Sequence, residues 1–407
     1  MKIIDGGVTS AKGFYAAAVA AEIKYKGRTD MALIYSEKPC KTAGTFTTNV
    51  VKAAPVKWDQ QVVESGVKSQ AVIVNSGIAN ACTGQEGMEY CKETAEKAAE
   101  VLGVESAGVL VGSTGVIGMQ LPMERIKKGV ELLAQSKEKS RQAGNLAAKA
   151  IMTTDTVEKE VAVQLEIGGK TITIGGMAKG SGMIHPNMCT MLAYITTDAV
   201  ITKKALQKAL REDVEDTYNM ISVDGDTSTN DTVLLLANGK ANNEKIHIGT
   251  PEYQLFVEAL HYVNETLAKK MAGDGEGATA LFEVRVVNAK TKKQAKALAK
   301  SVICSNLTKA AIAGHDANWG RILCAMGYSG ATFDPEKVDL YIESKAGKLQ
   351  LIQNGVALDY SETKATEILS QPEMTATADV KEGTEDATAW GCDLTHGYID
   401  INADYRS

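Results

Sequence analysis

One β-hairpin signal limits the possible folds of this chain more than any other feature. Residues Glu160–Gly175 read EVAVQLEIGGKTITIG, in which apolar and polar side chains alternate on both sides of two glycines. Alternation with period two is typical of a strand with one buried face, and Gly168-Gly169 suits a tight turn between two such strands. A two-residue turn joins antiparallel strands, so we do not expect a simple parallel doubly wound sheet.

Strand and helix signals alternate along the rest of the chain. Short apolar runs predict buried strands, whereas longer stretches with apolar residues every three or four positions predict helices. The predicted strands are Met31–Ser36, Gln70–Asn75, Thr190–Thr196 and Ala280–Asn288. The predicted helices are Gly87–Leu102, one or two surface helices within Met123–Met152, Lys203–Met220, one opened by Thr250-Pro251, and Lys290–Ala313. From Val338 onward we expect strands and turns with one short helix after Ser361. This mixture predicts an α/β or α+β layered fold, and no Ser/Gly/Pro-rich linker divides it.

The composition excludes several classes of function. The chain has 407 residues, a formal net charge of -6 and only 5% aromatic residues, so we expect neither a basic nucleic-acid surface nor a base-stacking platform. No apolar stretch approaches the roughly 20 residues of a membrane helix, and the start of the chain does not read as a signal peptide. The seven cysteines include no CxxC pair, and the five histidines include no HxxxH pair. We therefore expect a cytoplasmic small-molecule enzyme without a metal, nucleic-acid or membrane partner.

The glycine-rich stretch Gly175–Cys189 is the best candidate for a point at which the chain could be divided, by a chemical reaction and not by a linker. It leads through His185-Pro186, which favours an extended or turning backbone, directly into the predicted strand that begins at Thr190. A hydroxyl on such a turn can attack the carbonyl before it, and hydrolysis of the resulting ester frees the threonine α-amine. An α-amine titrates at about 7.7–8.0 and can act as base for its own hydroxyl. The residues alone leave the commoner alternative open, which is an ordinary turn before a strand.

Two further polar stretches have alternatives of their own. Gly112–Gly118 (GSTGVIG) is either an oxyanion-binding turn or a plain strand followed by a glycine turn, and it lacks the GxxxxGK[ST] pattern of a phosphate loop. Asp224–Asp231 (DGDTSTND) either lines a site or is a polar turn capped by its own side chains. It is not a calcium loop, because Thr229 and Leu235 stand where an EF-hand needs glycine and glutamate.

A series of short glycine-rich and polar segments runs through the chain. The longest is Gly175–Leu192, GGMAKGSGMIHPNMCTML. The others are Asn75–Thr83 (NSGIANACT), Gly112–Gly118, Met152–Asp155 (MTTD), Asp224–Asp231, Gly273–Ala280 (GDGEGATA), Gly314–Arg321 (GHDANWGR) and Ile399–Ser407 (IDINADYRS). In residues and in order, these segments are similar to those of the ornithine acetyltransferase family, which includes bifunctional glutamate N-acetyltransferases of arginine biosynthesis. One position departs from the family pattern, since Cys189 stands where alanine is usual. A small side chain should be tolerated there.

The resemblance implies a self-cleaving enzyme. Cleavage between Cys189 and Thr190 would divide the chain into residues 1–189 and 190–407, with Thr190 as the nucleophile. Cys189 as the nucleophile is the rival interpretation, which we disfavour because buried, unreactive cysteines are commoner. The implied fold is a layered mixed-sheet sandwich with helices, of the aminopeptidase/ornithine acetyltransferase type, plus a smaller C-terminal α/β part.

The resemblance also implies roles for individual residues. Thr114 and Gly115 would form the oxyanion hole. The residues that would bind substrate are Thr153, Lys179, Thr190, Glu276, Asn402 and Ser407. Lys179 suits a carboxylate, and Glu276 suits an ammonium group or a proton relay, although either residue, taken alone, reads as a solvated surface charge.

Three functions are to be distinguished. The first is acetyl transfer from N-acetylornithine to glutamate through acetyl-Thr190, a ping-pong cycle that needs no cofactor and leaves acetyl-CoA open as a second donor. The second is an N-terminal-nucleophile amidase or aminopeptidase, in which water is the acceptor. The third is a non-enzymatic binding or structural protein. The resemblance favours the first and implies a heterotetramer with two copies of each fragment.

Overall fold

The computed structural model describes residues 1–185 and 191–403, which form two compact units. Unit 1 comprises Met1–Gly180, Pro186–Tyr218 and Thr227–Leu267, and unit 2 comprises Ser181–His185, Asn219–Asp226 and Ala268–Ser407. The last passage of the chain between the units lies within one helix, α6 (Pro251–Gly273). A boundary inside a regular helix leaves no linker composition, which explains why the composition did not reveal two units.

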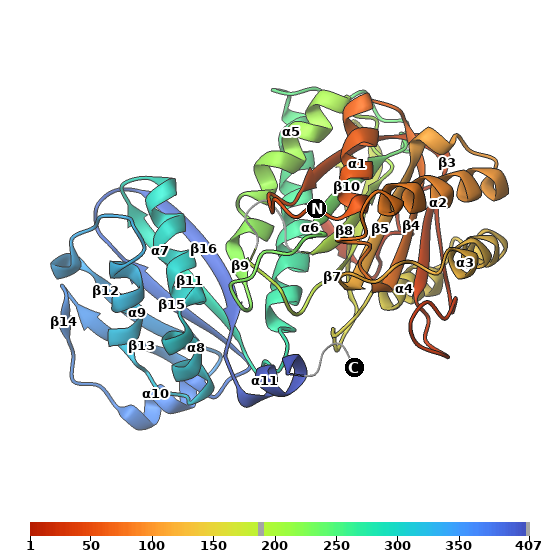
Figure 1. Cartoon of the computed structure of the whole chain (residues 1–407). Helices are drawn as coiled ribbons and strands as arrows, with labels where there is room; N and C mark the ends of the chain where they lie inside the picture. Colours follow the sequence, from red (N-terminus) through yellow and green to blue (C-terminus); the bar gives the residue numbers. More distant parts are fainter. Residues whose placement is uncertain (186–190, 404–407) are drawn as a thin grey trace. The chain divides into compact units, whose positions relative to one another are not determined.

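Unit 1 contains a nine-stranded mixed sheet (Figure 1). Its order is β1-β6-β7-β8-β10-β3-β4-β5, and β2 pairs with β3 off this path. The strands are β1 (Lys2–Ile4), β2 (Phe14–Val19), β3 (Met31–Phe46), β4 (Ser69–Ile78), β5 (Val109–Val116), β6 (Lys159–Ile167), β7 (Lys170–Lys179), β8 (Leu192–Thr197) and β10 (Thr232–Ala237). β8 and β10 are parallel, as are β4 and β5, while the other neighbours are antiparallel. The prediction of a mixed sheet is confirmed.

The predicted hairpin is confirmed as β6 and β7. Ile167 pairs with Lys170, so two residues form the turn between the strands. These are Gly168 and Gly169, whose φ angles are 56° and 71°. Two successive residues with positive φ characterise the turns that follow the twist of a hairpin, and glycine adopts them without a Cβ clash.

Both faces of the unit 1 sheet are buried. On β3, Ile34 packs into a hydrophobic cluster that includes residues of α4 (Arg141–Ala150). The preceding residue, Leu33, packs into a second cluster with residues of α2 (Glu86–Leu102) and α3 (Met123–Ser136). Neighbouring strand residues point to opposite faces, so helices cover this sheet on both sides and the unit is a layered sandwich. Two further helices, α1 (Ala54–Ser65) and α5 (Lys203–Val214), also pack against β3.

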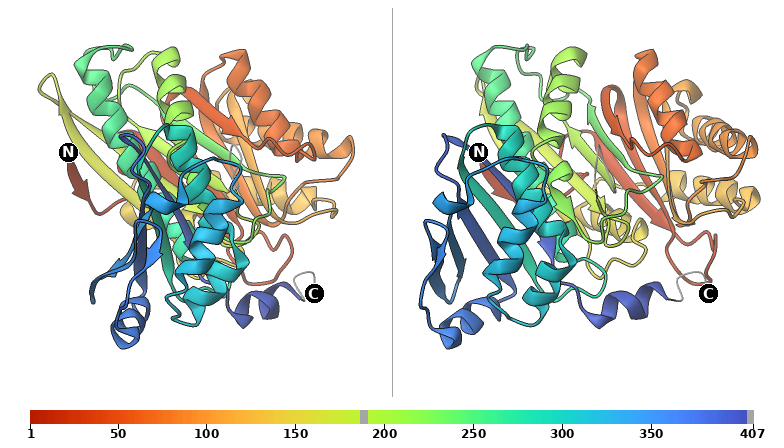
Figure 2. Two further views of the ribbon diagram at one scale, coloured as in Figure 1. Left: turned by 90° about the vertical axis from the view of Figure 1, so that its left-hand side faces the viewer. Right: turned by 60° about the vertical axis from the view of Figure 1, so that its left-hand side comes forward.

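Unit 2 is a smaller α/β part built on a seven-stranded sheet of order β14-β13-β12-β15-β11-β16-β9. The strands are β9 (Ile221–Ser222), β11 (Leu281–Ala289), β12 (Asp339–Ser344), β13 (Gly347–Gln353), β14 (Val356–Ala357), β15 (Glu373–Asp379) and β16 (Glu385–Cys392). The helices are α7 (Lys292–Cys304), α8 (Asn306–Ala313), α9 (Trp319–Gly327), α10 (Glu362–Leu369) and α11 (His396–Asn402). Helix α7 packs along β11 and β16, as Figure 2 shows, and α10 packs against β12 and β13.

Some helix boundaries were wrong. The predicted helix Lys290–Ala313 is divided into α7 and α8, because Ser305 has an extended backbone and its hydroxyl accepts the Thr308 N–H that begins α8. The helix that starts at Lys203 ends at Val214 instead of Met220. Helix α11 was not predicted at all. Among the described residues, no helix has the length and apolar character required to cross a membrane.

Candidate active site

Thr114 and Gly115 lie near the end of β5, beside β4. The parallel register sets Thr114 opposite Ser76 and Gly115 opposite Gly77. Gly115 has a φ angle of 126°, and a Cβ there would lie 2.3 Å from the carbonyl carbon of Gly77. Only glycine combines this backbone angle with this close approach, so the backbone path directly after Thr114 requires it.

Lys179, the last residue of β7, brings three of the predicted site residues of unit 1 together. Its Nζ donates to Thr153 Oγ1 at 2.7 Å and to Thr114 Oγ1 at 3.4 Å. Lys179 is only 7% exposed, so these hydroxyl oxygens take the place of water around its ammonium. Because the Thr114 oxygen accepts from Lys179, the Thr114 hydroxyl can still donate its own hydrogen to a further acceptor.

Asp155 connects the segments that carry these residues. Its carboxylate accepts the backbone N–H of Thr153 at 3.1 Å and that of Gly180 at 2.7 Å. The same carboxylate lies 2.7 Å from Lys159 Nζ and 3.7 Å from Lys179 Nζ. One side chain thus fixes the loop after α4 and the end of β7 relative to each other. The MTTD motif contained Asp155, but the sequence analysis assigned it no role.

The Asp155 carboxylate interacts with two lysine ammonium groups. The side chains of Asp155 and Lys159 are completely buried. Burial by itself would raise the pKa of Asp155, but the charges of Lys179 and Lys159 outweigh it and hold that pKa below its usual range. Of these three side chains, that of Lys179 retains some exposure. A small ligand with a carboxylate would be attracted to Lys179.

Glu276 and Asn402 lie in unit 2. Glu276, in the turn after α6, is 7% exposed, and its Oε2 accepts the Asn402 Nδ2 at 2.7 Å. The Glu276 N–H donates to the Ser181 carbonyl at 2.8 Å. A Cβ at Gly182 would lie 2.2 Å from the Glu276 carboxylate, so the glycine lets that carboxylate lie against the backbone. The structure therefore joins these two predicted site residues to the glycine-rich stretch.

A second glycine explains how α11 reaches Glu276. Gly277 has a φ angle of 71°, and a Cβ there would lie 2.4 Å from the backbone nitrogen of Tyr398. The Thr395 hydroxyl donates to the Gly277 carbonyl at 2.6 Å. This close backbone packing docks the start of α11 on the turn and directs Asn402 at its end toward Glu276.

Asp224 anchors the segment Ser181–His185 within unit 2. Its carboxylate accepts the Met183 N–H at 2.5 Å and the Ile184 N–H at 2.9 Å. It also accepts the N–H of Asp226 at 3.2 Å. The motif that begins at Asp224 is therefore partly a self-capped turn, as one alternative predicted, and partly an anchor for the glycine-rich stretch.

His185 ends that anchored segment in a polar environment. Its Nδ1 lies 3.1 Å from Ser222 Oγ and 3.4 Å from Cys304 Sγ. Burial lowers the pKa of His185 to about 4, and the charge of Lys300 acts in the same direction. The imidazole is therefore neutral at pH 7.

Cys189, Thr190 and Ser407 lie outside the described residues. The strand that follows Thr190 is nevertheless fixed in register, because Lys179 pairs with Leu192 across β7 and β8. The three predicted site residues of unit 1 are therefore grouped beside the strand that begins two residues after Thr190.

Asn230 supports the same region in a way that the sequence analysis missed. Its Nδ2 donates to the carbonyls of Ala79 at 2.6 Å and Ser113 at 2.8 Å. Ser113 directly precedes Thr114, so this buried amide ties β5 to the end of β4.

No group of three or more His, Cys, Asp or Glu within the described part of the chain is arranged to hold a metal ion.

The motif Gly314–Arg321 has a packing role inside unit 2. The Asn318 side chain accepts the Arg321 N–H and caps α9. The Arg321 guanidinium donates to the Leu307 carbonyl at 2.9 Å and so connects α9 to α8. These contacts hold α8 and α9 together.

Comparison with known proteins gives consistent matches. The ArgJ family matches residues 15–407. The arginine biosynthesis bifunctional protein ArgJ of Caldanaerobacter subterraneus is 53% identical over 407 residues, covering 100% of both chains. The protein of the same name from Bacillus subtilis is 48% identical, with 99% of this chain and 97% of the relative covered. The crystal structure of the bifunctional protein argJ from Bacillus halodurans matches with a TM-score of 0.51 and 43% identity, over 53% of this chain and 99% of that chain.

Proposed function

The chain belongs to the ArgJ family, and we propose that it transfers the acetyl group of N-acetylornithine to glutamate in arginine biosynthesis, through an acetyl ester on Thr190. The observation that carries the proposal is the grouping of Thr114, Thr153 and Lys179 beside the strand that follows Thr190. This grouping supports an oxyanion donor and a carboxylate site on either side of an acyl group held by that threonine.

Self-cleavage produces the nucleophile. Thr190 Oγ1 attacks the carbonyl carbon of Cys189, the peptide C–N bond breaks, and the nitrogen receives the hydroxyl proton. Water hydrolyses the resulting ester, which leaves a carboxylate on Cys189 and a free α-amine on Thr190. The Bacillus halodurans structure supports a divided chain, because the matched chain is covered over 99% of its length yet spans 53% of this one. A fragment of residues 190–407 makes up a similar share of the sequence.

The transfer cycle uses the same hydroxyl twice. The Thr190 α-amine takes the hydroxyl proton while the oxygen attacks the acetyl carbonyl of N-acetylornithine. The Thr114 hydroxyl and the Gly115 N–H donate to the oxyanion, and one such donor contributes about 2.7–4 kcal/mol to the transition state. The acetyl C–N bond then breaks and the proton passes to the leaving ornithine amine. The neutral α-amine of glutamate attacks acetyl-Thr190, which releases N-acetylglutamate and restores the hydroxyl.

Lys179 in unit 1 and Glu276 in unit 2 are each proposed to bind substrate. The Lys179 ammonium would pair with a substrate carboxylate. The Glu276 carboxylate suits an ammonium group, and Asn402 would orient that carboxylate. Ser407 completes the proposed set of substrate-binding residues.

The proposal also covers a second acetyl donor and the assembly of the two fragments. Relatives that are 53% and 48% identical are named bifunctional, which supports acetyl-CoA as a second acetyl donor for glutamate. We also propose that two copies of each fragment assemble in the cytoplasm.

Denaturing mass spectrometry and a transfer assay test the proposal together. The wild type and Thr190→Ser should give fragments of residues 1–189 and 190–407, because both keep the hydroxyl. Thr190→Ala should stay intact and lose at least about 10⁴-fold in transfer from N-acetylornithine. Acetate release without glutamate, at a rate that matches transfer, would instead identify an amidase. An uncut wild type with full activity would contradict the cleavage, and an intact chain without transfer would favour a binding protein.

A further inference from the structure

The loop of residues 20–30, between β2 and β3, combines basic and aromatic side chains. It reads AAEIKYKGRTD and carries Lys24, Tyr25, Lys26 and Arg28. Its base is fixed by the buried carboxylate of Asp30, which accepts the N–H groups of residues 21 and 23 at 2.7 and 2.6 Å. We call residues 20–30 the basic loop. It is the dark red excursion at the lower right of Figure 1.

The basic loop contacts the candidate site of unit 1 from two sides. Arg28 Nη2 donates to the carbonyls of Met152 at 2.6 Å and Thr153 at 3.1 Å. On the other side, a Cβ at Gly77 would lie 3.3 Å from Lys24 Cβ, and Gly77 is the residue against which Gly115 packs. The loop therefore adjoins both the expected oxyanion hole and an expected substrate-binding residue.

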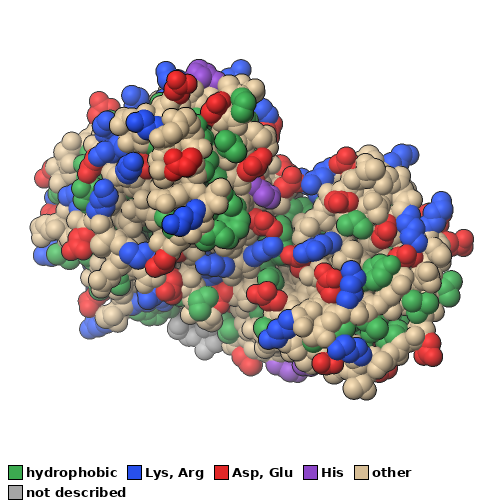
Figure 3. Space-filling model, turned by 180° about the vertical axis from the view of Figure 1, so that it is seen from behind, with side chains coloured by type: hydrophobic (Ala, Val, Ile, Leu, Met, Phe, Trp, Pro, Cys, Tyr) green, Lys and Arg blue, Asp and Glu red, His purple; other side chains and the backbone are tan. Residues whose placement is uncertain are grey.

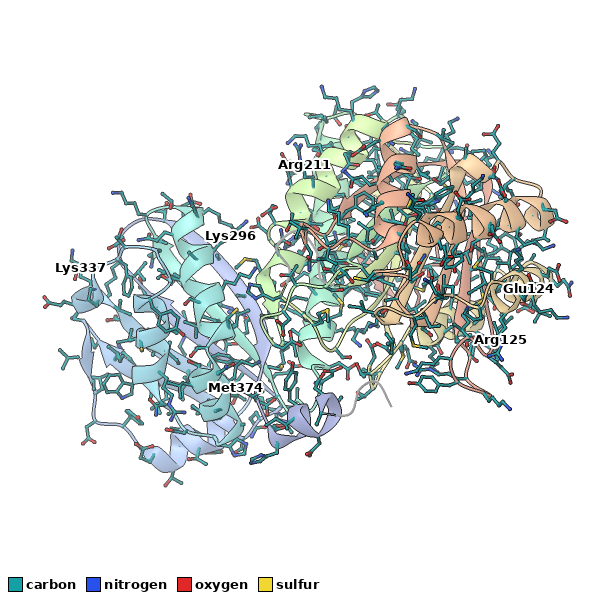
Figure 4. All side chains as sticks on the ribbon, in the orientation of Figure 1. Glu124, Arg125, Arg211, Lys296, Lys337 and Met374 are labelled. Carbon is teal, nitrogen blue, oxygen red and sulfur yellow. The ribbon has the colours of Figure 1, made fainter. Side chains whose placement is uncertain are left out.

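Lys24 and Lys26 of the basic loop form no ion pair with a carboxylate in the described part of the chain. Lys24 Nζ is buried without a hydrogen-bond partner there and lies 4.6 Å from the ring centroid of Tyr25. Lys26 is exposed, and Arg28 donates to carbonyl oxygens. Arg125, labelled in Figure 4 at the start of α3, adds a fourth cation by donating to the Glu22 carbonyl.

Lysines elsewhere in unit 1 provide a contrast. On α2 and α3, Lys97 lies 2.7 Å from a Glu131 oxygen and Lys127 lies 2.8 Å from a Glu93 oxygen. Acidic and basic side chains are likewise intermixed over the face shown in Figure 3. The basic loop has two acids of its own, Glu22 and Asp30, of which Asp30 is buried, accepts backbone N–H groups and feels the charge of Arg28. Within the described residues neither acid forms an ion pair with Lys24 or Lys26, so these two lysines provide positive charge beside the acyl-transfer site.

The amino-acid substrates do not need this charge. N-acetylornithine carries one carboxylate and one ammonium group, and glutamate is equally small. A coenzyme A thioester instead carries a diphosphate, a 3′-phosphate and an adenine. Lysine and arginine bind phosphate oxygens, and a tyrosine that is 41% exposed offers a face for an adenine ring. We propose that the basic loop binds the adenosine 3′-phosphate 5′-diphosphate part of the acetyl-CoA donor, which rests on the proposed function of this site.

Comparing the two donors in one enzyme tests the proposal. Lys24→Ala/Lys26→Ala should raise the KM for acetyl-CoA at least about 10-fold, because two charge-assisted phosphate contacts are lost. Transfer from N-acetylornithine to glutamate should stay within about twofold of the wild type, since that donor has no phosphate. The matched control is Lys57→Ala/Lys68→Ala, which removes the same charge from exposed positions on and just after α1. It should leave both KM values unchanged.

Adenosine 3′,5′-bisphosphate provides a probe without an acetyl group. It should inhibit the acetyl-CoA reaction of the wild type competitively, weaken as ionic strength rises, and inhibit Lys24→Ala/Lys26→Ala far less. Tyr25→Ala should also weaken this inhibition, whereas Tyr25→Phe should preserve it because the ring is kept.

Three results would overturn the role of the basic loop. They are an unchanged KM for acetyl-CoA in Lys24→Ala/Lys26→Ala, equal losses with both donors, and an inability of the wild type to use acetyl-CoA. In the last case, continued transfer from N-acetylornithine would leave the proposed function standing, while absence of transfer from either donor would reject both.

Discussion

The two units hold their charged site residues in different ways. In unit 1, Asp155 and Lys159 are completely buried, and Asp155 is bonded to two backbone N–H groups as well as to lysine. In unit 2, Glu276 is bonded to Asn402, which lies on the exposed surface of α11. A buried, fully bonded charge cluster is costly to desolvate but keeps one geometry, whereas a carboxylate that has one of its partners on an exposed helix can adjust when that partner moves. We infer that unit 1 fixes its charges in advance and that unit 2 allows its carboxylate to adapt.

The largest expected difference is in stability. Asp155→Asn should lower the free energy of unfolding by about 3–5 kcal/mol, because a completely buried ion pair loses its carboxylate and two backbone N–H groups lose a charged acceptor. Glu276→Gln should cost less than about 1.5 kcal/mol, since the amide oxygen can still accept from Asn402. Urea unfolding followed by circular dichroism at one protein concentration measures both. Equal losses in the two variants would show that the units hold their charges alike.

The next effect is on transfer. Lys179→Met should lower kcat/KM for N-acetylornithine by about 10²–10³-fold, because a buried ammonium that meets a carboxylate contributes about 2–5 kcal/mol when truncated. Asp155 keeps Lys159 as a partner in this variant, so the protein should still fold. Circular dichroism provides the control for folding. A loss below about threefold would exclude Lys179 as the main carboxylate ligand.

The two units should also respond differently to acid. His185 in unit 2 has a pKa of about 4 when folded, below its ordinary value of 6.5. Below pH 6.5 the unfolded chain takes up a proton that the folded chain refuses, so stability falls as the pH drops toward 4. Because His185 is partly solvated, we expect a loss of about 1 kcal/mol between pH 7 and pH 5. His185→Asn, in processed protein, should show a flatter profile over this range.

Asp155 in unit 1 should lose its contribution in the same direction, but at lower pH. Its pKa is lowered, so its contribution is complete above the ordinary carboxyl range and is lost only as the pH falls below about 4. Unfolding measured from pH 7 to pH 5 should therefore be insensitive to this carboxylate. If the free energy of unfolding of His185→Asn depends on pH as that of the wild type does, His185 is not the source of the acid sensitivity.

The smallest expected effect concerns Asn402. Asn402→Ala removes one hydrogen bond to a carboxylate that keeps other contacts, so the KM for N-acetylornithine should rise only about threefold. Asn402→Asp would instead place two carboxylates together and should have a larger effect. Steady-state kinetics of both variants measures how far Glu276 depends on α11. A loss for Asn402→Ala as large as that of Lys179→Met would mean that unit 2 is no more adaptable than unit 1.

Local sequence patterns predicted many of the strands and helices. Period-two alternation around Gly168-Gly169 was sufficient for the hairpin, and the apolar periodicity of Gly87–Leu102 was sufficient for α2. The sequence pattern did not predict the break at Ser305 or the helix α11. One serine inside a helical pattern and seven weakly apolar residues give little periodic signal. The composition did not reveal the two units, since their contacts join segments that are far apart in the chain, whereas the family resemblance did imply the smaller C-terminal α/β part.

In the candidate site too, local sequence motifs indicated some residues, and residues that depend on tertiary contacts were missed. Family-like motifs pointed to Thr114, Thr153 and Lys179, and the structure brings these together. Asp155 and Lys159 were missed because an acid and a lysine four residues apart usually form a weak surface pair. Their complete burial depends on how β6, β7 and α4 meet, which no local pattern records.

The strand order β7-β8-β10-β3 has a consequence for the lifetime of the protein. A cut before Thr190 assigns β8 and β10 to the second fragment, while β7 and β3 on either side belong to the first. The fragments could then separate only by breaking two ladders in the middle of one sheet, and rejoining would require two chains to meet. Folding as one chain would thus become a step that cannot be repeated. The lifetime of the cleaved protein would then depend on its rate of unfolding, which is kinetic stability, and not on an equilibrium between folded and unfolded states.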